Sequence, residues 1–200
     1  MKLAVLLLSA AAALAQTSSS KPAAKPAPAK PQSAAPQSPA PDDGTLDGAL
    51  YTSDYFGFSY TIPEFLEVNE DFMQGQEDAS RRSFVLLALE GAAAQAGYQD
   101  VLVLSADRNV YPNVKTAADY LAKTTREHFQ PRGFEVIAPA RNITLGGRTF
   151  SRIDYRKGEI YQTVIAGLMR GYIVMFTLAA PSSDELERMV GSLNTLKFRG

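Results

Sequence analysis

The chain has 200 residues, of which 46% are hydrophobic and 20% are charged, and its formal net charge is −1. This composition is typical of one globular domain with additional sequence, and the near-neutral charge gives no sign of nucleic acid binding. The lack of cysteine excludes disulfides, cysteine-ligated metals, thiol nucleophiles and an acylated lipoprotein anchor.

The first fifteen residues have the pattern of an export signal. Lys2 supplies a short positive region, an apolar run follows over 3–14, and Ala-Leu-Ala at 13–15 is a cleavage site that would leave Gln16 as the first mature residue. A membrane anchor is the alternative, but a span needs about 20 apolar residues. We therefore predict a signal peptide over 1–15, cleaved after Ala15, no transmembrane segment after cleavage, and a periplasmic or secreted protein.

Residues 16–49 are expected to form a disordered linker rich in Pro, Ala, Ser and Lys. Seven of the twelve prolines lie between positions 16 and 46, and that stretch holds no aromatic residue. Such a segment cannot bury enough apolar surface to offset its ordering entropy. Lys21, Lys25 and Lys30 precede any acidic residue, so a contact with an anionic surface is an alternative to the passive spacer that we favour.

The globular domain is predicted over 50–200 and opens with the stretch "YTSDYFGFSYTIPEFLEVN" (51–69). Two aromatic and β-branched runs, 51–55 and 58–62, flank Phe56-Gly57 and indicate two strands around a bend. Pro63 ends the second run and is expected to open a short helical turn over 64–68.

A polar loop is predicted over 69–82, with acidic pairs at 70–71 and 77–78. Carboxylates could hold calcium, but their spacing does not match an EF-hand, and the arginines at 81–82 would neutralise much of the charge. We interpret this segment as a solvated loop, and a weak metal site there as the alternative.

Strands that are apolar on both faces alternate with two helices along the rest of the chain. Nearly continuous apolar runs predict covered strands at 83–90, 100–107 and 172–180. A helix is expected over 116–130, capped by Thr116 with Asp119, and a second begins with a capping box over 182–185. Further strands are predicted at 134–138, 143–145, 148–155 and 160–169, with a tight hairpin at Gly146-Gly147.

The second helix carries an amphipathic stripe of Leu186, Met189, Val190 and Leu193. Because several strands are apolar on both faces, the sheet needs helices on both sides. The predicted class is α+β, as an α/β/α sandwich with a central, mostly antiparallel sheet, a mid-chain helix and a C-terminal amphipathic helix.

The segment "YFGFSYTIPEFLEV" resembles the opening of PsbP-like domains. The resemblance extends to Gly146-Gly147-Arg148 in a hairpin and to a C-terminal helix that ends near "SL..LKF" (192–198), so that it covers 51–198. It implies a central antiparallel sheet between helices and docking on a larger assembly. It implies no active site, because the family as a whole shares none.

Catalytic signatures are missing from the sequence. It holds no GxSxG, GxGxxG, P-loop or HExxH pattern. His128 falls on the helix face that also carries Tyr120, Leu121 and Thr124. It could act with Ser105 and Asp107, but we interpret it as a partly buried helix residue. We therefore predict no catalytic residue, no cofactor site and no metal site.

The segment Arg152 to Gln162 alternates charged residues with Tyr155 and Tyr161 on a predicted hairpin. Tyr and Arg are enriched at interfaces, so this hairpin is the best candidate for a recognition surface. The same alternation is what an exposed hairpin needs for solubility, and we favour that interpretation.

Our main functional hypothesis is an exported, non-enzymatic accessory or binding module of the bacterial cell envelope that docks on a protein partner. One alternative is a small-ligand binder with its pocket between sheet and helix. The other is a hydrolase that works through carboxylates or His128.

Overall fold

The computed structural model describes residues 41–42, 44–73, 83–91, 99–109 and 111–199. The predicted signal peptide, most of the linker, the acidic pair at 77–78 and the arginines at 81–82 lie outside these residues. Among the described residues, no helix has the length and apolar character needed to cross a membrane.

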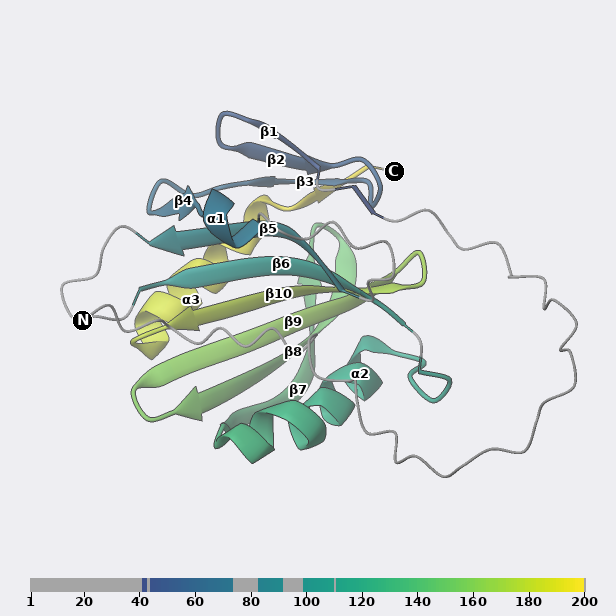
Figure 1. Cartoon of the computed structure of the whole chain (residues 1–200), viewed down its shortest axis with the longest axis vertical. Helices are drawn as coiled ribbons and strands as arrows, with labels where there is room; N and C mark the ends of the chain where they lie inside the picture. The colour runs from purple at the N-terminus through teal and green to yellow at the C-terminus, as the bar shows by residue number, and fades with distance from the viewer. Residues whose placement is uncertain (1–40, 43, 74–82, 92–98, 110, 200) are drawn as a thin grey trace, which may run out of the picture.

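A seven-stranded antiparallel sheet forms the centre of the domain (Figure 1). Its strand order is β4-β5-β6-β10-β9-β8-β7. The strands are β4 (Leu66–Val68), β5 (Ser83–Gly91), β6 (Val101–Arg108), β7 (Glu135–Leu145), β8 (Arg148–Lys157), β9 (Ile160–Met169) and β10 (Tyr172–Ala180). The apolar runs predicted the bounds of β5, β6, β9 and β10 to within one residue.

A second antiparallel sheet of four strands, ordered β1-β2-β3-β11, packs beside the first. It is formed by β1 (Thr45–Asp47), β2 (Leu50–Ser53), β3 (Phe58–Thr61) and β11 (Lys197–Phe198). Strand β1 begins inside the range 16–49 that the sequence assigns to the linker. The C-terminal strand β11 pairs with β3, which brings the two ends of the described domain together.

Three helices accompany the sheets: α1 (Glu70–Met73), α2 (Ala117–Thr124) and α3 (Ser183–Ser192). Thr116 and Asp119 form the predicted capping box of α2. This helix continues into a π-helical turn, Thr125–Phe129, and a 3-10 turn, Gln130–Arg132. At α3, the Ser182 hydroxyl accepts from the Glu185 backbone N–H as expected. The Glu185 carboxylate, however, accepts from the Ser182 hydroxyl.

Both faces of the large sheet are covered, which confirms the predicted layering. One face packs with α3 and the small sheet into a core that includes Phe58, Phe176 and Met189. The other packs against α2 around Leu121 and Ile173. Each of these large side chains contributes about 1.5–3 kcal/mol by leaving water, so cover on both faces is the main source of stability.

Other local predictions also differ from the structure, since the polar loop expected over 69–82 contains the short helix α1. The segment after Pro63 forms strand β4 on the edge of the large sheet, because Leu66 pairs with Gly91 and is buried there. The two short strands expected at 134–138 and 143–145 are one long strand, β7. It runs through Pro139 as an edge strand, with two register shifts on either side of Ala138 where Pro139 and extra residues interrupt its pairing with β8.

The hairpin of β8 and β9 is not the exposed alternating surface that the sequence suggested. Arg152, Asp154 and Tyr155 are buried. Asp154 accepts hydrogen bonds from the Thr163 hydroxyl (2.5 Å), Arg152 Nε (2.7 Å) and Arg141 Nη2 (2.7 Å). The remaining guanidinium nitrogens of Arg152 bind both carboxylate oxygens of Glu187 on α3. This network connects α3 to strand β8 of the large sheet.

We predict that Asp154→Ala lowers the free energy of unfolding by about 3–5 kcal/mol, because it leaves the Arg152 guanidinium buried without its inner partner. The side chains of Arg152 and Asp154 are 7% and 8% exposed, whereas that of Glu187 is 60% exposed. Glu187→Gln should therefore cost less than about 1 kcal/mol. Urea unfolding of both variants checks this, and equal losses would contradict it.

Candidate functional site

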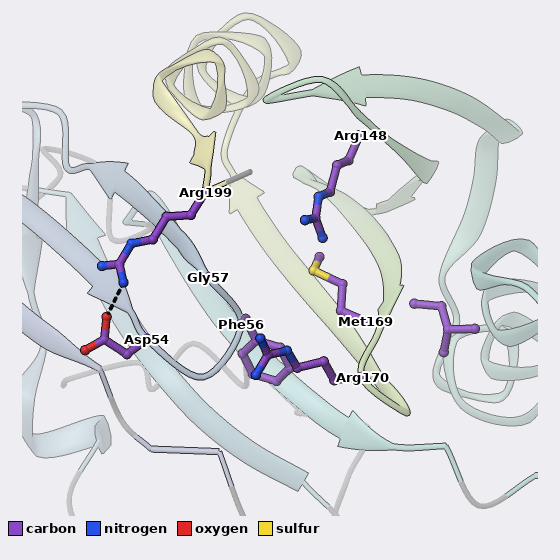
Figure 2. A pocket seen from close by; sticks show the side chains of 8 residues that line it. Asp54, Phe56, Gly57, Arg148, Met169, Arg170 and Arg199 are labelled. Carbon is purple, nitrogen blue, oxygen red and sulfur yellow. Dashed lines mark ion pairs between the residues drawn. The ribbon is translucent and has the colours of Figure 1, made fainter.

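A cleft of about 460 Å³ opens where the small sheet meets one end of the large sheet. It is lined by Asp54, Phe56, Gly57, Arg148, Leu168, Met169, Arg170 and Arg199. Figure 2 shows Arg148 pointing toward Met169, and Arg199 turned toward Asp54. The lining comes from four segments that are far apart in the sequence, so the fold assembles this site.

The pairing of β11 with β3 brings Arg199 to the cleft. The backbone N–H of Arg199 donates to the carbonyl of Gly57 at 2.9 Å. Its guanidinium forms an ion pair with Asp54 at 2.7 Å, but both side chains are more than 60% exposed. Exposed pairs of this kind contribute about 0–1 kcal/mol, so a ligand could take Arg199 from Asp54 at little cost.

Arg148 enters the cleft from the hairpin that joins β7 to β8. Its guanidinium carbon lies 4.3 Å from the centre of the Phe198 ring, in a cation–π contact. The hairpin reaches this position because Gly146 has no side chain: a Cβ there would lie 2.8 Å from the Leu196 carbonyl oxygen and from the Phe198 ring. Gly146 therefore permits the contact that holds Arg148 over the ring.

Arg170 occupies the first position of the two-residue turn between β9 and β10. Both turn residues have positive φ, +50° at Arg170 and +81° at Gly171. Such turns favour Asn or Gly at the first position, and a left-handed conformation costs an L-residue about 1–2 kcal/mol. Among the described residues, Arg170 is the one non-glycine residue with positive φ. Backbone strain of this kind clusters at functional sites.

The cleft carries a surplus of two positive charges, from three guanidinium groups and one carboxylate. The guanidinium of Arg170 lies over the Tyr55 ring at 5.5 Å, as that of Arg148 lies over Phe198. Within the described part of the chain, neither of these guanidinium groups has a hydrogen bond or ion pair. A cation–π contact positions a guanidinium group beside a ring while leaving its N–H groups available to bind an anion in a bidentate contact.

The catalytic hypothesis combined His128, Ser105 and Asp107, and the structure forms only some of the contacts that it requires. Asp107 accepts hydrogen bonds from the Ser83 hydroxyl at 2.5 Å and from the Tyr120 hydroxyl of α2. His128 has an electrostatic interaction with Asp107, but no hydrogen bond links its ring to a described residue. Ser105 is buried. A nucleophile–base–acid chain is therefore not formed among these residues.

Burial explains the electrostatics of this cluster. It raises the pKa of the Asp107 carboxyl, against the opposing effect of the Ser83 and Tyr120 hydrogen bonds. It also raises the pKa of Tyr120, and the Asp107 charge adds to that. Burial lowers the pKa of His128, as does the charge of Arg132. The cluster joins β5, β6 and α2 and has the character of a structural contact.

The described residues contain no group of three or more His, Cys, Asp or Glu side chains able to hold a metal ion. Glu70 and Asp71, half of the acidic loop considered from the sequence, form the first turn of α1. Glu77 and Asp78 lie outside the described residues.

Sequence reasoning missed all three cleft arginines. Arg148 and Arg199 carry no local signal, because their partners are distant in the sequence. Arg170 did carry one: "LMRGY" (168–172) places an arginine where a tight turn between two strands favours Asn or Gly.

We predict that the difference in unfolding free energy between the native chain and Asp107→Asn depends on pH. The folded pKa of Asp107 lies above the ordinary 3.8, so the folded state binds this proton more tightly than the unfolded chain. The resulting stability is present below pH 3.8 and is lost as the pH rises through the raised pKa.

The native chain should therefore lose stability relative to Asp107→Asn over the pH range above about 4, by about 1.4 kcal/mol for each tenfold difference in proton affinity. Urea unfolding of both proteins across this range measures it. A difference that stays constant with pH would contradict the prediction.

Comparisons with known proteins agree with this architecture. No family model and no curated protein matches the chain. The solution structure of cyanobacterial PsbP (CyanoP) from Synechocystis matches with a TM-score of 0.50 and 14% identity, over 78% of this chain and 98% of that one.

Two other solved structures are less similar. A Pseudomonas aeruginosa protein of unknown function has a TM-score of 0.44 and 18% identity, over 76% of this chain and 96% of its own. LpqN, involved in cell envelope biogenesis of Mycobacterium tuberculosis, has a TM-score of 0.42 and 12% identity, over 72% and 83%. At these identities a likeness shows the fold alone. The resemblance expected from the sequence is confirmed at that level: the domain has a PsbP-like α+β fold.

Proposed function

We propose that this protein is an exported, non-enzymatic binding module of the bacterial cell envelope. We further propose that it holds an anionic ligand in the cleft lined by Arg148, Arg170 and Arg199, which we call the arginine cleft. One observation carries the proposal: Arg148 and Arg170 line the same cleft, the guanidinium group of each is in a cation–π contact with an aromatic ring, and neither has an anionic partner among the described residues. The predicted export signal over 1–15 and the lysines at 21, 25 and 30 in the predicted linker support the location.

The size of the cleft favours a small ligand over the protein partner that the family resemblance implied. Pockets for small molecules span about 300–1,000 Å³, whereas a stable protein interface buries about 800 Å² on each partner. A volume of about 460 Å³ lies in the first class. The site lies between the two sheets and not, as the small-ligand hypothesis expected, between a sheet and a helix.

The hydrolase alternative has less support. The cleft lining contains one carboxylate, Asp54, and no Ser, Thr, His, Lys or Tyr. Asp54 is already paired with Arg199. The Asp107 cluster, which does contain hydroxyl groups, is positioned by β5, β6 and α2 and is not part of this cleft.

We predict that small anions raise the melting temperature of the mature chain, from Gln16, in a concentration-dependent manner. The panel is inorganic phosphate, pyrophosphate, sulfate and citrate at low ionic strength, where screening is weak. Arg148→Gln should weaken binding about 10- to 100-fold, because a hydrogen bond to a charged group contributes about 1.5–3 kcal/mol. Arg126→Gln is the matched control, because Arg126 is exposed in the π-helical turn after α2 and is not among the residues that line the cleft.

The proposal fails if no anion of the panel changes the melting temperature. It fails equally if Arg126→Gln weakens binding as much as Arg148→Gln, since the effect would then reflect the overall charge of the protein.

We predict that Arg170→Asn separates stability from binding. Asn relieves the strain of the left-handed position, and the lost cation–π contact with Tyr55 offsets part of that gain, so the free energy of unfolding should stay unchanged or rise by up to about 1 kcal/mol. Anion affinity should fall about tenfold or more. If Arg170 serves only to hold Tyr55, stability falls and affinity does not. Urea unfolding and calorimetric titration of the same preparation distinguish these results.

A further inference from the structure

We infer that the ligand of the arginine cleft is the dianion of a phosphate monoester carried on a polyol or a sugar-sized group. This inference rests on the proposed function and names the ligand class for the same site. It is argued from the charge, the donor arrangement and the size of the cleft.

Charge is the first argument. The cleft carries a surplus of two positive charges, and its guanidinium groups stay protonated throughout the accessible pH range. A phosphate monoester carries about −1.5 to −2 at pH 7. A phosphodiester or a simple carboxylate carries one negative charge and would leave the cleft with uncompensated positive charge.

The arrangement of donors is the second argument. Arg148 and Arg170 enter on two different hairpins of the large sheet, and Arg199 enters from the end of the small sheet. Three guanidinium groups that enter from separate elements supply one donor group for each of the three terminal oxygens of a phosphate monoester, and each of these oxygens is a strong acceptor. A planar carboxylate has two oxygens and cannot present one to each of the three groups.

The cleft is also larger than a bare ion requires. Its volume of about 460 Å³ is in the range of pockets for organic ligands. Its remaining lining supplies contacts for a carrier: Leu168 is 45% exposed on the rim and can cover a carbon skeleton. The Asp54 carboxylate can accept hydrogen bonds from hydroxyl groups, particularly once Arg199 has turned to the phosphate.

Two kinds of molecule in a cell envelope can present a phosphate monoester group. One is a soluble sugar or polyol phosphate, and the other is a lipid whose headgroup ends in a phosphate monoester. The structure assigns the shared monoester group.

The test is calorimetric titration of the mature chain with three matched probes: glycerol 3-phosphate, a monoester; glycerophosphoglycerol, the corresponding diester; and malate, a dicarboxylate. Glycerol 3-phosphate should bind at least about tenfold more tightly than either of the others, by charge and donor matching. Arg148→Gln and Arg170→Asn should each reduce that affinity about tenfold or more, and Arg126→Gln should leave it unchanged.

A pH series gives an independent readout. The second ionisation of a phosphate monoester has a pKa near 6, so glycerol 3-phosphate affinity should fall about tenfold between pH 7.5 and 5, while diester affinity stays constant. The titratable groups of the cleft are its three arginines and Asp54, and Tyr55 beside Arg170 stays neutral because burial raises its pKa. Asp54→Asn is therefore the control, and the tenfold fall should persist in it.

Vesicle co-sedimentation identifies the source. Phosphatidylcholine vesicles that contain phosphatidic acid present a monoester, and those that contain phosphatidylglycerol at equal surface charge present a diester. Retention on the first alone, with competition by glycerol 3-phosphate, supports a lipid headgroup. Binding of soluble glycerol 3-phosphate without retention on either vesicle supports a soluble ester.

Equal or tighter binding of malate or of the diester would overturn the monoester inference while leaving an anion-binding module in place. If none of the three probes binds but an anion of the inorganic panel does, the inference likewise falls alone. If that panel also has no effect, the proposed function itself fails.

Discussion

The large sheet is apolar on both faces, and the need to cover both faces determines where the other elements lie. Leu87 and Phe176 project into the core on the side of α3, whereas Ile173 and Val164 project toward α2. Neither helix alone could cover the sheet. The small sheet completes the layer that contains α3, and β11 closes it by pairing with β3 after the chain has left α3.

The arginine cleft is a consequence of this two-part cover. The small sheet and the hairpins of the large sheet meet at one end, and the residues at their junction are turn and terminal residues. Their side chains are not needed in the core. Phe56 and Met169 line the cleft as buried core residues, while the guanidinium groups of Arg148 and Arg170 are in contact with the aromatic rings of Phe198 and Tyr55. The site can therefore vary in chemistry without disturbing the packing on which stability depends.

Strands that are apolar on both faces were predictable from the sequence, because a continuous run such as "YIVMFTLAA" (172–180) has few other folded solutions. Helices α2 and α3 were predictable from their caps, whereas α1 lies in the segment 69–82 that was expected to be a loop. The buried pair Arg152 and Asp154 was not, because alternation of charged and apolar residues is the same for an exposed strand and for a strand whose polar face is covered by a partner such as Glu187. That distinction depends on α3, which is remote in sequence.

The cleft was unpredictable from the sequence because most of its residues are brought together by tertiary structure, and Arg170 is the exception. Arg148 and Arg199 depend on contacts made by tertiary structure. Arg170 conflicts with its own local backbone, and a local conflict is visible in the sequence whenever the turn type can be inferred. Tight hairpin turns in this chain place glycine at positive φ, as at Gly146-Gly147, and the arginine at position 170 departs from that rule. Departures of this kind are expected where function opposes local preference.

The placement of the three arginines also couples the ligand to the junction between the sheets. Arg148 and Arg170 belong to the large sheet, whereas Arg199 and its partner Asp54 belong to the end of the small sheet. A ligand held by all three groups would bridge the two sheets and oppose their separation. Because binding to the folded state alone adds to its stability, the ligand would strengthen this junction most. The exposed ion pair of Arg199 and Asp54 keeps the third guanidinium beside the cleft, yet its small energy allows the exchange.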